Sequence, residues 1–549
     1  MFAKVFIVAL FFVVMIGIGL YARRKVQGVG DFVLGGRAMG PWLSAFAYGT
    51  SYFSGVVFIG YAGQFGWSYG LSATWIGLGN ALIGSLLAWV MLGRRTRVMT
   101  RHLRASTMPE FFAKRYGGGD SLKLMASAII FIFLVPYSAS VYKGLSGLFS
   151  VAFGVDYRYV IWGMGLLTGA YVILGGYMAT ALNDFVQGLI MLGGIALVVF
   201  SVLRGQGGFM EAVRRLSLIP SESAGTLGQP GVYAGFFGPD PLGLLSVVVL
   251  TSLGTWGLPQ MLHKFYMIKD EKAIKTGTII STIFAIVVSG GSYFTGAFGR
   301  LYVDSPASVG GFDGIVPAML SGQLSDVLMG VVVVLVLSAS MSTLAALVIA
   351  SASTFTLDFV RTKLAPNMPE KQQMLTIRLM CAVFVLVSVL LALNPGALIT
   401  TLMSVSWGAL AGSFLAPFLY GLFWKRAARA GVWASFAVGT VLTVGNAAFG
   451  WTTPIIAGAL AMIASLVICP MVSLLAPAPD LAAVEHAFAG YDEGAKVEGR
   501  YAKISGNGAL SRVSGSESPV GAPLWRVSRA APLTAGDRNP APPNPVPGQ

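Results

Sequence analysis

The chain has 549 residues, of which 55% are hydrophobic and only 11% are charged. Soluble globular proteins carry roughly 25% charged residues, so this composition, with a mean hydropathy of +0.74, excludes a soluble protein. The net charge of +15 does not indicate nucleic-acid binding, because the basic residues gather at the ends of apolar runs, as they do in membrane proteins.

Apolar runs recur along most of the chain, and each is long enough to cross a bilayer as a helix. They predict an all-α polytopic membrane protein with about 13 transmembrane helices. The first run, 4–22, has a long apolar core and no small-residue cleavage site after it, so we interpret it as a span rather than a signal peptide. The other spans are expected near 42–65, 73–93, 122–149, 158–178, 182–203, 241–263, 274–298, 326–356, 374–393, 397–421, 430–449 and 452–475.

Lysine and arginine are concentrated in alternate loops, those after the first, third, seventh, ninth and eleventh spans. The loop after the seventh span, for example, begins with Lys264 and also holds Lys269, Lys272 and Lys275. By the positive-inside rule these loops face the cytoplasm. An odd number of spans then places the N-terminus outside and the C-terminus in the cytoplasm, in a multi-pass protein of the cell inner (plasma) membrane.

The chain is expected to have two parts, a transmembrane domain over 1–475 and a tail over 477–549. The tail is rich in Pro, Gly, Ala and Ser and shows no apolar period. Such a segment cannot bury enough apolar surface to offset its loss of conformational entropy. We therefore predict a disordered cytoplasmic tail.

Two of the predicted spans are interrupted by helix-breaking residues. One contains Gly49 and Gly55 in "YGTSYFSGV", and the other contains Gly254, Gly257 and Pro259 in "LGTWGLPQ". Each opens a series of five spans, about 42–203 and about 241–421, with extra spans at 430–475. Five is odd, so the second series would cross the membrane upside down relative to the first. Interrupted helices at matching positions indicate a transporter binding site, although Gly and Pro are also common in ordinary membrane helices.

The segment "SASMSTLAA" at 338–346 places four hydroxyl groups inside an apolar span. Ala339, Ser342 and Thr343 stand at i, i+3 and i+4, on one face of a helix. Two hydroxyl oxygens and a carbonyl oxygen suit a hard cation such as Na⁺, and a broken helix opposite could add backbone carbonyls. The alternative is close helix packing, which small and hydroxylated residues also permit.

Several blocks of the chain resemble, in order and spacing, the sodium:solute symporter family. They are "DFVLGGRAMGPWLSAFAYGTSYFSG" at 31–55, "STMPEFFAKRYGG" at 106–118, "GGYMATALNDFVQGLIMLGG" at 175–194 and "SASMSTLAALVIASASTFTLDF" at 338–359. The resemblance covers about 1–475 and implies the LeuT-type fold, a 5+5 inverted repeat. The block "GLPQMLHKFYMIKDEKAI" at 257–274 is most similar to the pantothenate and proline branches.

The resemblance also implies a sodium site made of backbone and hydroxyl oxygens. Its ligands would be the carbonyls of Thr50, Phe53 and Ala339 and the hydroxyls of Ser342 and Thr343. Asp184 would act in sodium release toward the cytoplasm. A carboxylate at the start of a span needs a role or a partner, although an acid at a helix N-terminus is also favoured by the helix dipole.

Candidate substrate residues lie on the helices next to the two breaks. They are Ser54, Gly55, Tyr137, Tyr142, Lys143, Trp256 and Gln260. Lys143 would pair with a substrate carboxylate or act as an internal cation in place of the coupling ion; snorkelling to the outer interface is the alternative.

At two places the chain departs from members of the family that it resembles. Tyr52 stands where some proline-type members have Asp, which implies a site without that acid. Val56 and Val57 replace polar residues of some sugar-type members, which disfavours a sugar.

Together these features predict a secondary active transporter that couples Na⁺ entry to uptake of a small organic solute by alternating access. A carboxylated solute is favoured, such as an amino acid like proline, pantothenate or a monocarboxylate. Its partners are the solute, Na⁺ as coupling ion and the bilayer, with no other cofactor, no nucleic acid and no indicated oligomeric state. No P-loop and no catalytic constellation is present, which disfavours an ATP-driven pump or an enzyme. Proton coupling through Lys143 or Asp184, and a membrane sensor domain, remain as alternatives.

Overall fold

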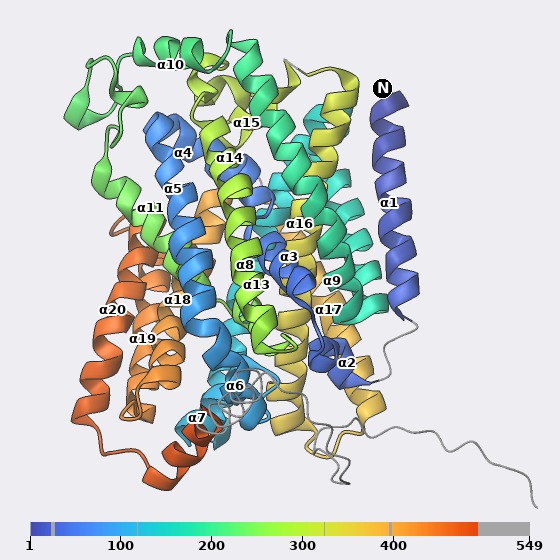
Figure 1. Cartoon of the computed structure of the whole chain (residues 1–549), viewed down its shortest axis with the longest axis vertical. Helices are drawn as coiled ribbons and strands as arrows, with labels where there is room; N and C mark the ends of the chain where they lie inside the picture. The colour runs from blue at the N-terminus through green and yellow to red at the C-terminus, as the bar shows by residue number, and fades with distance from the viewer. Residues whose placement is uncertain (1, 24–27, 118, 323, 395–397, 492–549) are drawn as a thin grey trace, which may run out of the picture. The chain divides into compact units, whose positions relative to one another are not determined.

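The computed structural model describes residues 2–23, 28–117, 119–322, 324–394 and 398–491, and every regular element in these ranges is a helix (Figure 1). The α-helices are α1 (Phe2–Arg23), α2 (Val29–Leu34), α3 (Pro41–Tyr52), α4 (Ala62–Tyr69), α5 (Thr74–Gly79), α6 (Arg94–His102), α7 (Met108–Tyr116), α8 (Gly119–Phe153), α9 (Tyr157–Gly205), α10 (Phe209–Ser217), α11 (Pro241–Leu253), α12 (Pro259–Tyr266), α13 (Glu271–Ala285), α14 (Gly291–Gly296), α15 (Ile315–Ser321), α16 (Asp326–Thr354), α17 (Glu370–Ala392), α18 (Ile399–Phe423), α19 (Arg429–Phe449) and α20 (Pro454–Leu475). Wider π-helical turns continue several of them: η2 (Val56–Tyr61), η4 (Asn80–Leu87), η5 (Trp89–Gly93), η9 (Ile286–Gly290) and η13 (Phe355–Leu364). Short 3₁₀ turns make up the rest: η1 (Gly35–Arg37), η3 (Gly70–Ala73), η6 (Ala224–Thr226), η7 (Val232–Ala234), η8 (Gly254–Trp256), η10 (Gly299–Leu301), η11 (Pro306–Val309) and η12 (Phe312–Gly314).

The helices have the length and hydropathy of membrane spans, which confirms the all-helical membrane fold. In the described ranges, 10 helices are long and apolar enough to cross a bilayer, or 11 when the bent pair α11 and α12 counts as one span. This is fewer than the thirteen spans predicted. The predicted span near 42–65 is divided into short pieces by its break, and the one near 158–178 forms the first part of α9, before a kink at Gly176 (φ 57°).

Helix α16 forms the centre of the helical bundle. It packs against α8, α9 and α3, and its most apolar stretch is buried throughout. A membrane helix that is covered on all sides can carry hydroxyl groups, because neighbouring helices rather than lipid surround them. Helix α1 lies at one edge beside α9, and α18, α19 and α20 pack together at the other edge (Figure 1).

Both predicted helix breaks are present in the structure. Helix α3 ends at Tyr52, Phe53 is extended (φ −104°, ψ 95°), and helical structure resumes at Val56. The second broken segment bends by 40° between Trp256 and Pro259. A proline lacks the backbone N–H and disfavours helical backbone in the residue before it, which accounts for the second break.

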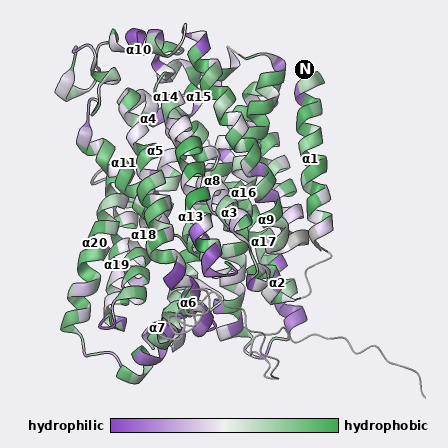
Figure 2. Ribbon diagram, viewed as in Figure 1, coloured by the Kyte–Doolittle hydropathy of each residue, from purple (hydrophilic) through white to green (hydrophobic). Residues whose placement is uncertain are grey.

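Hydrophilic residues gather at the two ends of the bundle, around α10 at one end and around α6 and α7 at the other (Figure 2). At the α6 end, the segments that precede α3 and follow α12 are joined by backbone hydrogen bonds. The N–H of Met39 donates to the carbonyl of Met267 (3.2 Å), and the N–H of Lys269 donates to the carbonyl of Met39 (3.0 Å). The Arg101 guanidinium donates to the carbonyl of Ile268 between them (3.1 Å). The two broken segments are therefore tied together at this end.

The beginning of the predicted disordered tail is ordered, which corrects that prediction for residues 481–491. They form a helix whose N-terminus is capped by Asp480. Val484, Ala487 and Phe488 are buried, and the Tyr491 hydroxyl donates to the carbonyl of Arg95 (3.3 Å). The spacing of three to four residues between these side chains is an amphipathic helical period, but it is short and directly follows the proline-containing segment 476–480. The rest of the tail, 492–549, lies outside the described residues.

Candidate sodium and substrate site

Oxygen atoms from two helices distant in sequence meet beside the break after α3. The Thr343 hydroxyl donates to the carbonyls of Thr50 (3.2 Å) and Ala339 (3.1 Å). The Ser342 hydroxyl lies 3.1 Å from each of the same two carbonyl oxygens. All four residues are fully buried. The structure thus brings together Thr50, Ala339, Ser342 and Thr343, four of the five predicted sodium ligands.

The helix break explains why the carbonyl of Thr50 is available to α16. In a continuous helix this carbonyl would accept from the N–H of Ser54, but the chain leaves the helix at Phe53. On the other side, Ser342 and Thr343 bond carbonyls one turn back in their own helix, which keeps both hydroxyl oxygens at its α3 face. If the two hydroxyl groups rotate so that their protons leave these carbonyls, the four oxygen atoms become free to bind a cation such as Na⁺ directly, with both hydroxyls still protonated.

The fifth predicted ligand, the carbonyl of Phe53, stays a prediction. Within the described residues, Phe53 makes no hydrogen bond to α16; its N–H donates to the Gly49 carbonyl, and its ring stacks on Tyr52 at 4.2 Å. The carbonyl of Ser51 instead lies 3.4 Å from the Thr343 hydroxyl. Sequence reasoning missed Ser51, whose only signal was its position next to Thr50 at the break.

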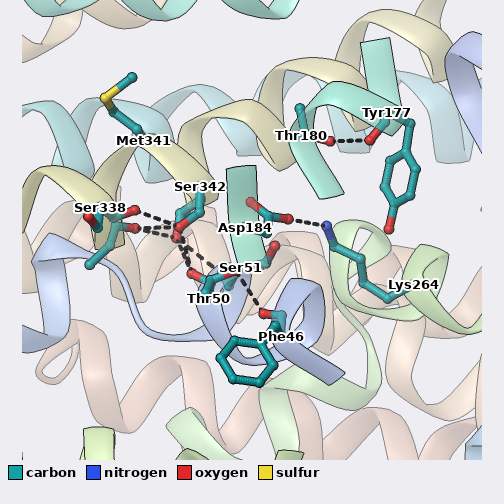
Figure 3. Close-up of polar contacts among 12 residues, drawn as sticks. Phe46, Thr50, Ser51, Tyr177, Thr180, Asp184, Lys264, Ser338, Met341 and Ser342 are labelled. Carbon is teal, nitrogen blue, oxygen red and sulfur yellow. Dashed lines mark hydrogen bonds and ion pairs between the residues drawn. The ribbon is translucent and has the colours of Figure 1, made fainter. Parts of the chain in front are cut away.

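Asp184 lies one helical turn from the oxygen cluster. Four residues further along α9, Gly188 packs against the Thr50 side chain. Figure 3 shows the Asp184 carboxylate reaching toward Lys264 of α12, and the two charged groups are 3.5 Å apart. Asp184 is 1% exposed and Lys264 is 3% exposed. Burying two charges is costly even when they pair, so the pair calls for a functional explanation.

Lys264 is a residue that the sequence analysis placed wrongly, at the start of a cytoplasmic loop. It lies inside the protein, with its ammonium group 5.0 Å from the centre of the Tyr177 ring. Because the predicted span ended at residue 263, Lys264 was counted among the loop lysines. Lys264 stands four residues after Gln260 and therefore on the same helix face as that candidate substrate residue. This spacing was the signal in the sequence that could have placed Lys264 inside the protein.

Several candidate substrate residues meet where the two breaks face each other. Gly55 packs against Ser340 of α16 so closely that a Cβ would collide with the serine hydroxyl. The Gln260 amide, at the start of α12, is 1% exposed and has no hydrogen-bond partner in the described part of the chain. The Tyr137 hydroxyl and the indole N–H of Trp407 are also buried; their rings are 5.9 Å apart, and the hydroxyl lies close to the indole N–H and to Ser54. Buried polar groups without partners are rare, and a bound polar ligand would satisfy them. Ser54 lies at the same break, where its hydroxyl oxygen accepts from the N–H of Val56 (3.2 Å).

Two other candidates have partners elsewhere, and Tyr142 is fully buried with no hydrogen-bond partner for its hydroxyl in the described ranges. The Trp256 indole N–H donates to the carbonyl of Ile83 (3.0 Å). The Lys143 ammonium donates to the carbonyl of Asn394 (2.9 Å) and lines a cavity of about 650 Å³ together with Asp313. This cavity opens at the end of the bundle opposite α6, away from the oxygen cluster. Burial raises the pKa of the Asp313 carboxyl, and the N–H of Ile399 and the Lys143 charge oppose that rise.

The close contact at Gly55 leads to a mutational prediction. Gly55→Ala is expected to reduce transport by at least about tenfold, because displacing Ser340 by an ångström shifts the α16 face that carries the site. The measurement is the initial uptake rate of solute at matched expression. Gly147→Ala in α8, where a Cβ meets no atom within 4 Å, is the control and should transport normally. Equal rates for wild type and Gly55→Ala would show that the contact has no functional role.

Comparison with known proteins identifies the class of the chain. The model of the sodium:solute symporter family matches residues 32–439. The osmoregulated proline transporter OpuE of Bacillus subtilis is 31% identical over 472 residues, covering 84% of this chain and 93% of the relative. The sodium/proline symporter of Salmonella typhimurium is 28% identical over 449 residues, covering 80% and 86%.

A solved structure shares the fold. The outward-open state of a Na⁺-coupled sialic acid symporter superposes with a TM-score of 0.68, covering 87% of this chain and 99% of that one at 17% identity. These relatives are transporters, which confirms the prediction of a multi-pass transport protein of the plasma membrane rather than an enzyme. The family match over most of the chain, together with the broken helices, shows that the chain belongs to the sodium:solute symporter family.

Proposed function

We propose that the chain is a Na⁺/proline symporter with thirteen spans in a 5+5 inverted repeat, its N-terminus outside and its C-terminus in the cytoplasm. The choice of proline is supported by the two relatives described above, a proline transporter and a sodium/proline symporter. The count of thirteen adds two spans to those of sufficient length: the divided one over α3, η2 and α4, and the first part of α9.

The observation that carries the proposal is the oxygen cluster between α3 and α16. Na⁺ bound to Thr50, Ala339, Ser342 and Thr343 would tether the two helices in a state open to the outside. Solute binding at the adjacent break would then stabilise the closed state further, since both ligands favour the same arrangement. Opening toward the cytoplasm would separate α3 from α16 and release the ion.

The two breaks also provide chemistry that suits proline. Helical structure restarts at η2 and at α12, and a helix N-terminus favours a carboxylate. The ring faces of Tyr52 and Trp407, 6.2 Å apart, suit the secondary ammonium of proline and the apolar pyrrolidine. In this proposal an aromatic ring at Tyr52 takes the place of the acid found in some proline-type members.

During sodium release, Lys264 would replace Na⁺ as the counter-charge of Asp184. Because the carboxylate is buried, it needs a cation at every stage of the cycle. The lysine provides one when the ion has left, so the empty carrier can return without an uncompensated charge. Lys264 thereby takes the part of internal cation that the sequence suggested for Lys143.

A binding experiment tests the proposal. Thermal unfolding of the purified protein is measured with proline in NaCl, in KCl, and in KCl across a range of pH. We expect proline to raise the Tm only in NaCl, because a ligand stabilises in proportion to its occupancy. Equal stabilisation in KCl at acidic pH would favour proton coupling, the alternative that the buried Asp184 supports. No shift with proline under any condition, but a shift with pantothenate or a monocarboxylate, would replace the substrate.

A further inference from the structure

A second acid–lysine pair joins η13, which continues α16, to the start of α8. Asp358 in η13 is 1% exposed, and its carboxylate is 3.5 Å from the ammonium of Lys123 in α8. The other carboxylate oxygen, Oδ2, makes no hydrogen bond of standard geometry within the described ranges, and the Thr107 side chain lies close to the carboxyl. The contact is longer than the ion pair of Lys114 with Glu110 (2.7 Å). Asp358 is therefore a buried anion that its partner only partly compensates.

Two further hydroxyl groups lie next to this carboxylate, on the helix face that also carries the oxygen cluster. Thr343, Ser351, Thr354 and Asp358 follow one another at intervals of eight, three and four residues, which places them on one face of α16. Ser351 is fully buried, and its hydroxyl has no partner among the described residues. The distance from Thr343 to Asp358 is about 22 Å along the helix. The seven residues between Thr343 and Ser351 are apolar, so the side-chain oxygens of this face form two groups, one at the oxygen cluster and one from Ser351 to Asp358.

The local helix geometry also distinguishes this position. At Phe355 the helix changes from α to π, and the wider π turns run through Asp358 to Leu364. Such turns leave backbone groups less tightly bonded and are frequent at functional sites. Lys123 is 20% exposed, so its ammonium group can move into water when a cation takes its place. Glu110 also lies near Asp358 and adds negative charge.

We propose that the Asp358 carboxylate is a second site for a monovalent cation, at which Na⁺ pauses on its way to the cytoplasm, and that Lys123 occupies the carboxylate when the ion has left. This second proposal rests on the proposed function, because it assumes Na⁺ coupling and a cytoplasmic orientation of the α6 end of the bundle. It assigns different roles to the two carboxylates: Asp184 receives the ion from the oxygen cluster, and Asp358 delivers it to water.

The experiment measures how Na⁺ on the cytoplasmic side inhibits uptake. Right-side-out membrane vesicles are loaded with increasing NaCl, and the initial uptake of labelled proline is measured at constant external Na⁺. Asp358→Asn should raise the internal Na⁺ concentration that halves uptake by about tenfold, since the ion loses its anionic ligand. Lys123→Gln should lower that concentration, because the competing internal cation is gone. External Na⁺ dependence should stay as in wild type for both variants.

The opposite directions of the two effects separate a cation site from a structural ion pair. A structural pair predicts that both variants lose transport while the internal Na⁺ sensitivity stays unchanged, and that outcome would overturn the proposal. The double variant Asp358→Asn/Lys123→Gln has no uncompensated charge, so it should be expressed well and keep the insensitivity of Asp358→Asn. Asp120→Asn neutralises an exposed acid at the same end of α8 and should behave as wild type. Wild-type uptake that does not depend on external Na⁺ would instead contradict the proposed function.

Discussion

Thr343→Ala is expected to raise the Na⁺ concentration needed for half-maximal uptake by about tenfold to a hundredfold. The Thr343 hydroxyl oxygen lies 3.1–3.2 Å from the carbonyls of Ala339 and Thr50, in a fully buried cluster. A polar contact to a charged group contributes about 1.5–3 kcal/mol, which corresponds to that change in affinity. The measurement is a titration of external Na⁺ against the initial uptake rate of labelled proline.

A serine on the same helix provides the matched control. The Ser353 hydroxyl bonds only to carbonyls of its own helix, at Ile349 and Ala350, so Ser353→Ala removes a buried hydroxyl without touching α3. Its Na⁺ requirement should equal that of wild type. Thr343→Ser keeps the oxygen and should also stay close to wild type. An unchanged Na⁺ requirement in Thr343→Ala, at normal expression, would remove Thr343 from the site.

Asp184→Asn is expected to reduce both stability and transport. It leaves the ammonium of Lys264 buried without its partner, and removing one member of a buried pair costs about 3–5 kcal/mol. The double variant Asp184→Asn/Lys264→Gln removes both charges and should recover most of the stability. Its transport should remain low, because no carboxylate receives the ion. Thermal unfolding of the purified variants and initial uptake rates measure the two effects separately.

The partly exposed acid Glu211 serves as the comparison for this pair. It pairs with Arg214 and Arg215 on α10 near the surface, where ion pairs contribute little to stability. Glu211→Gln should therefore change neither the Tm nor the uptake rate. If the double variant at Asp184 and Lys264 were no more stable than Asp184→Asn alone, the unpaired Lys264 ammonium would not be the cause of the lost stability.

The sequence allowed prediction of those parts of the site that depend on local patterns. Ala339, Ser342 and Thr343 share a helix face through their spacing, and Gly55 and Pro259 indicate the helix breaks in the sequence itself. The carbonyl of Thr50 followed from the first break together with the family resemblance. In each of these cases the chemistry is determined by residues close together in the chain.

The remaining parts depend on contacts that spacing does not encode. Whether Lys264 faces solvent or Asp184 is decided by how α12 packs against α9. Hydropathy ended the predicted span at residue 263, one residue before Lys264, and so assigned the lysine to the loop. Lys143 had the sequence signature of an internal cation, yet its side chain extends to Asn394 at the other end of the bundle. The helix at 481–491 was missed because a short amphipathic period is weak evidence until its surface has a partner.

The backbone link between Met39 and Lys269 has a practical consequence. We expect opening of the α6 end to separate the two broken segments. That movement would break the hydrogen bonds donated by the N–H groups of Met39 and Lys269 and by the Arg101 guanidinium. Both amide protons would then exchange with deuterium from the solvent. Their exchange rates provide a built-in readout of inward opening, and sodium should slow both of them even when no solute is transported.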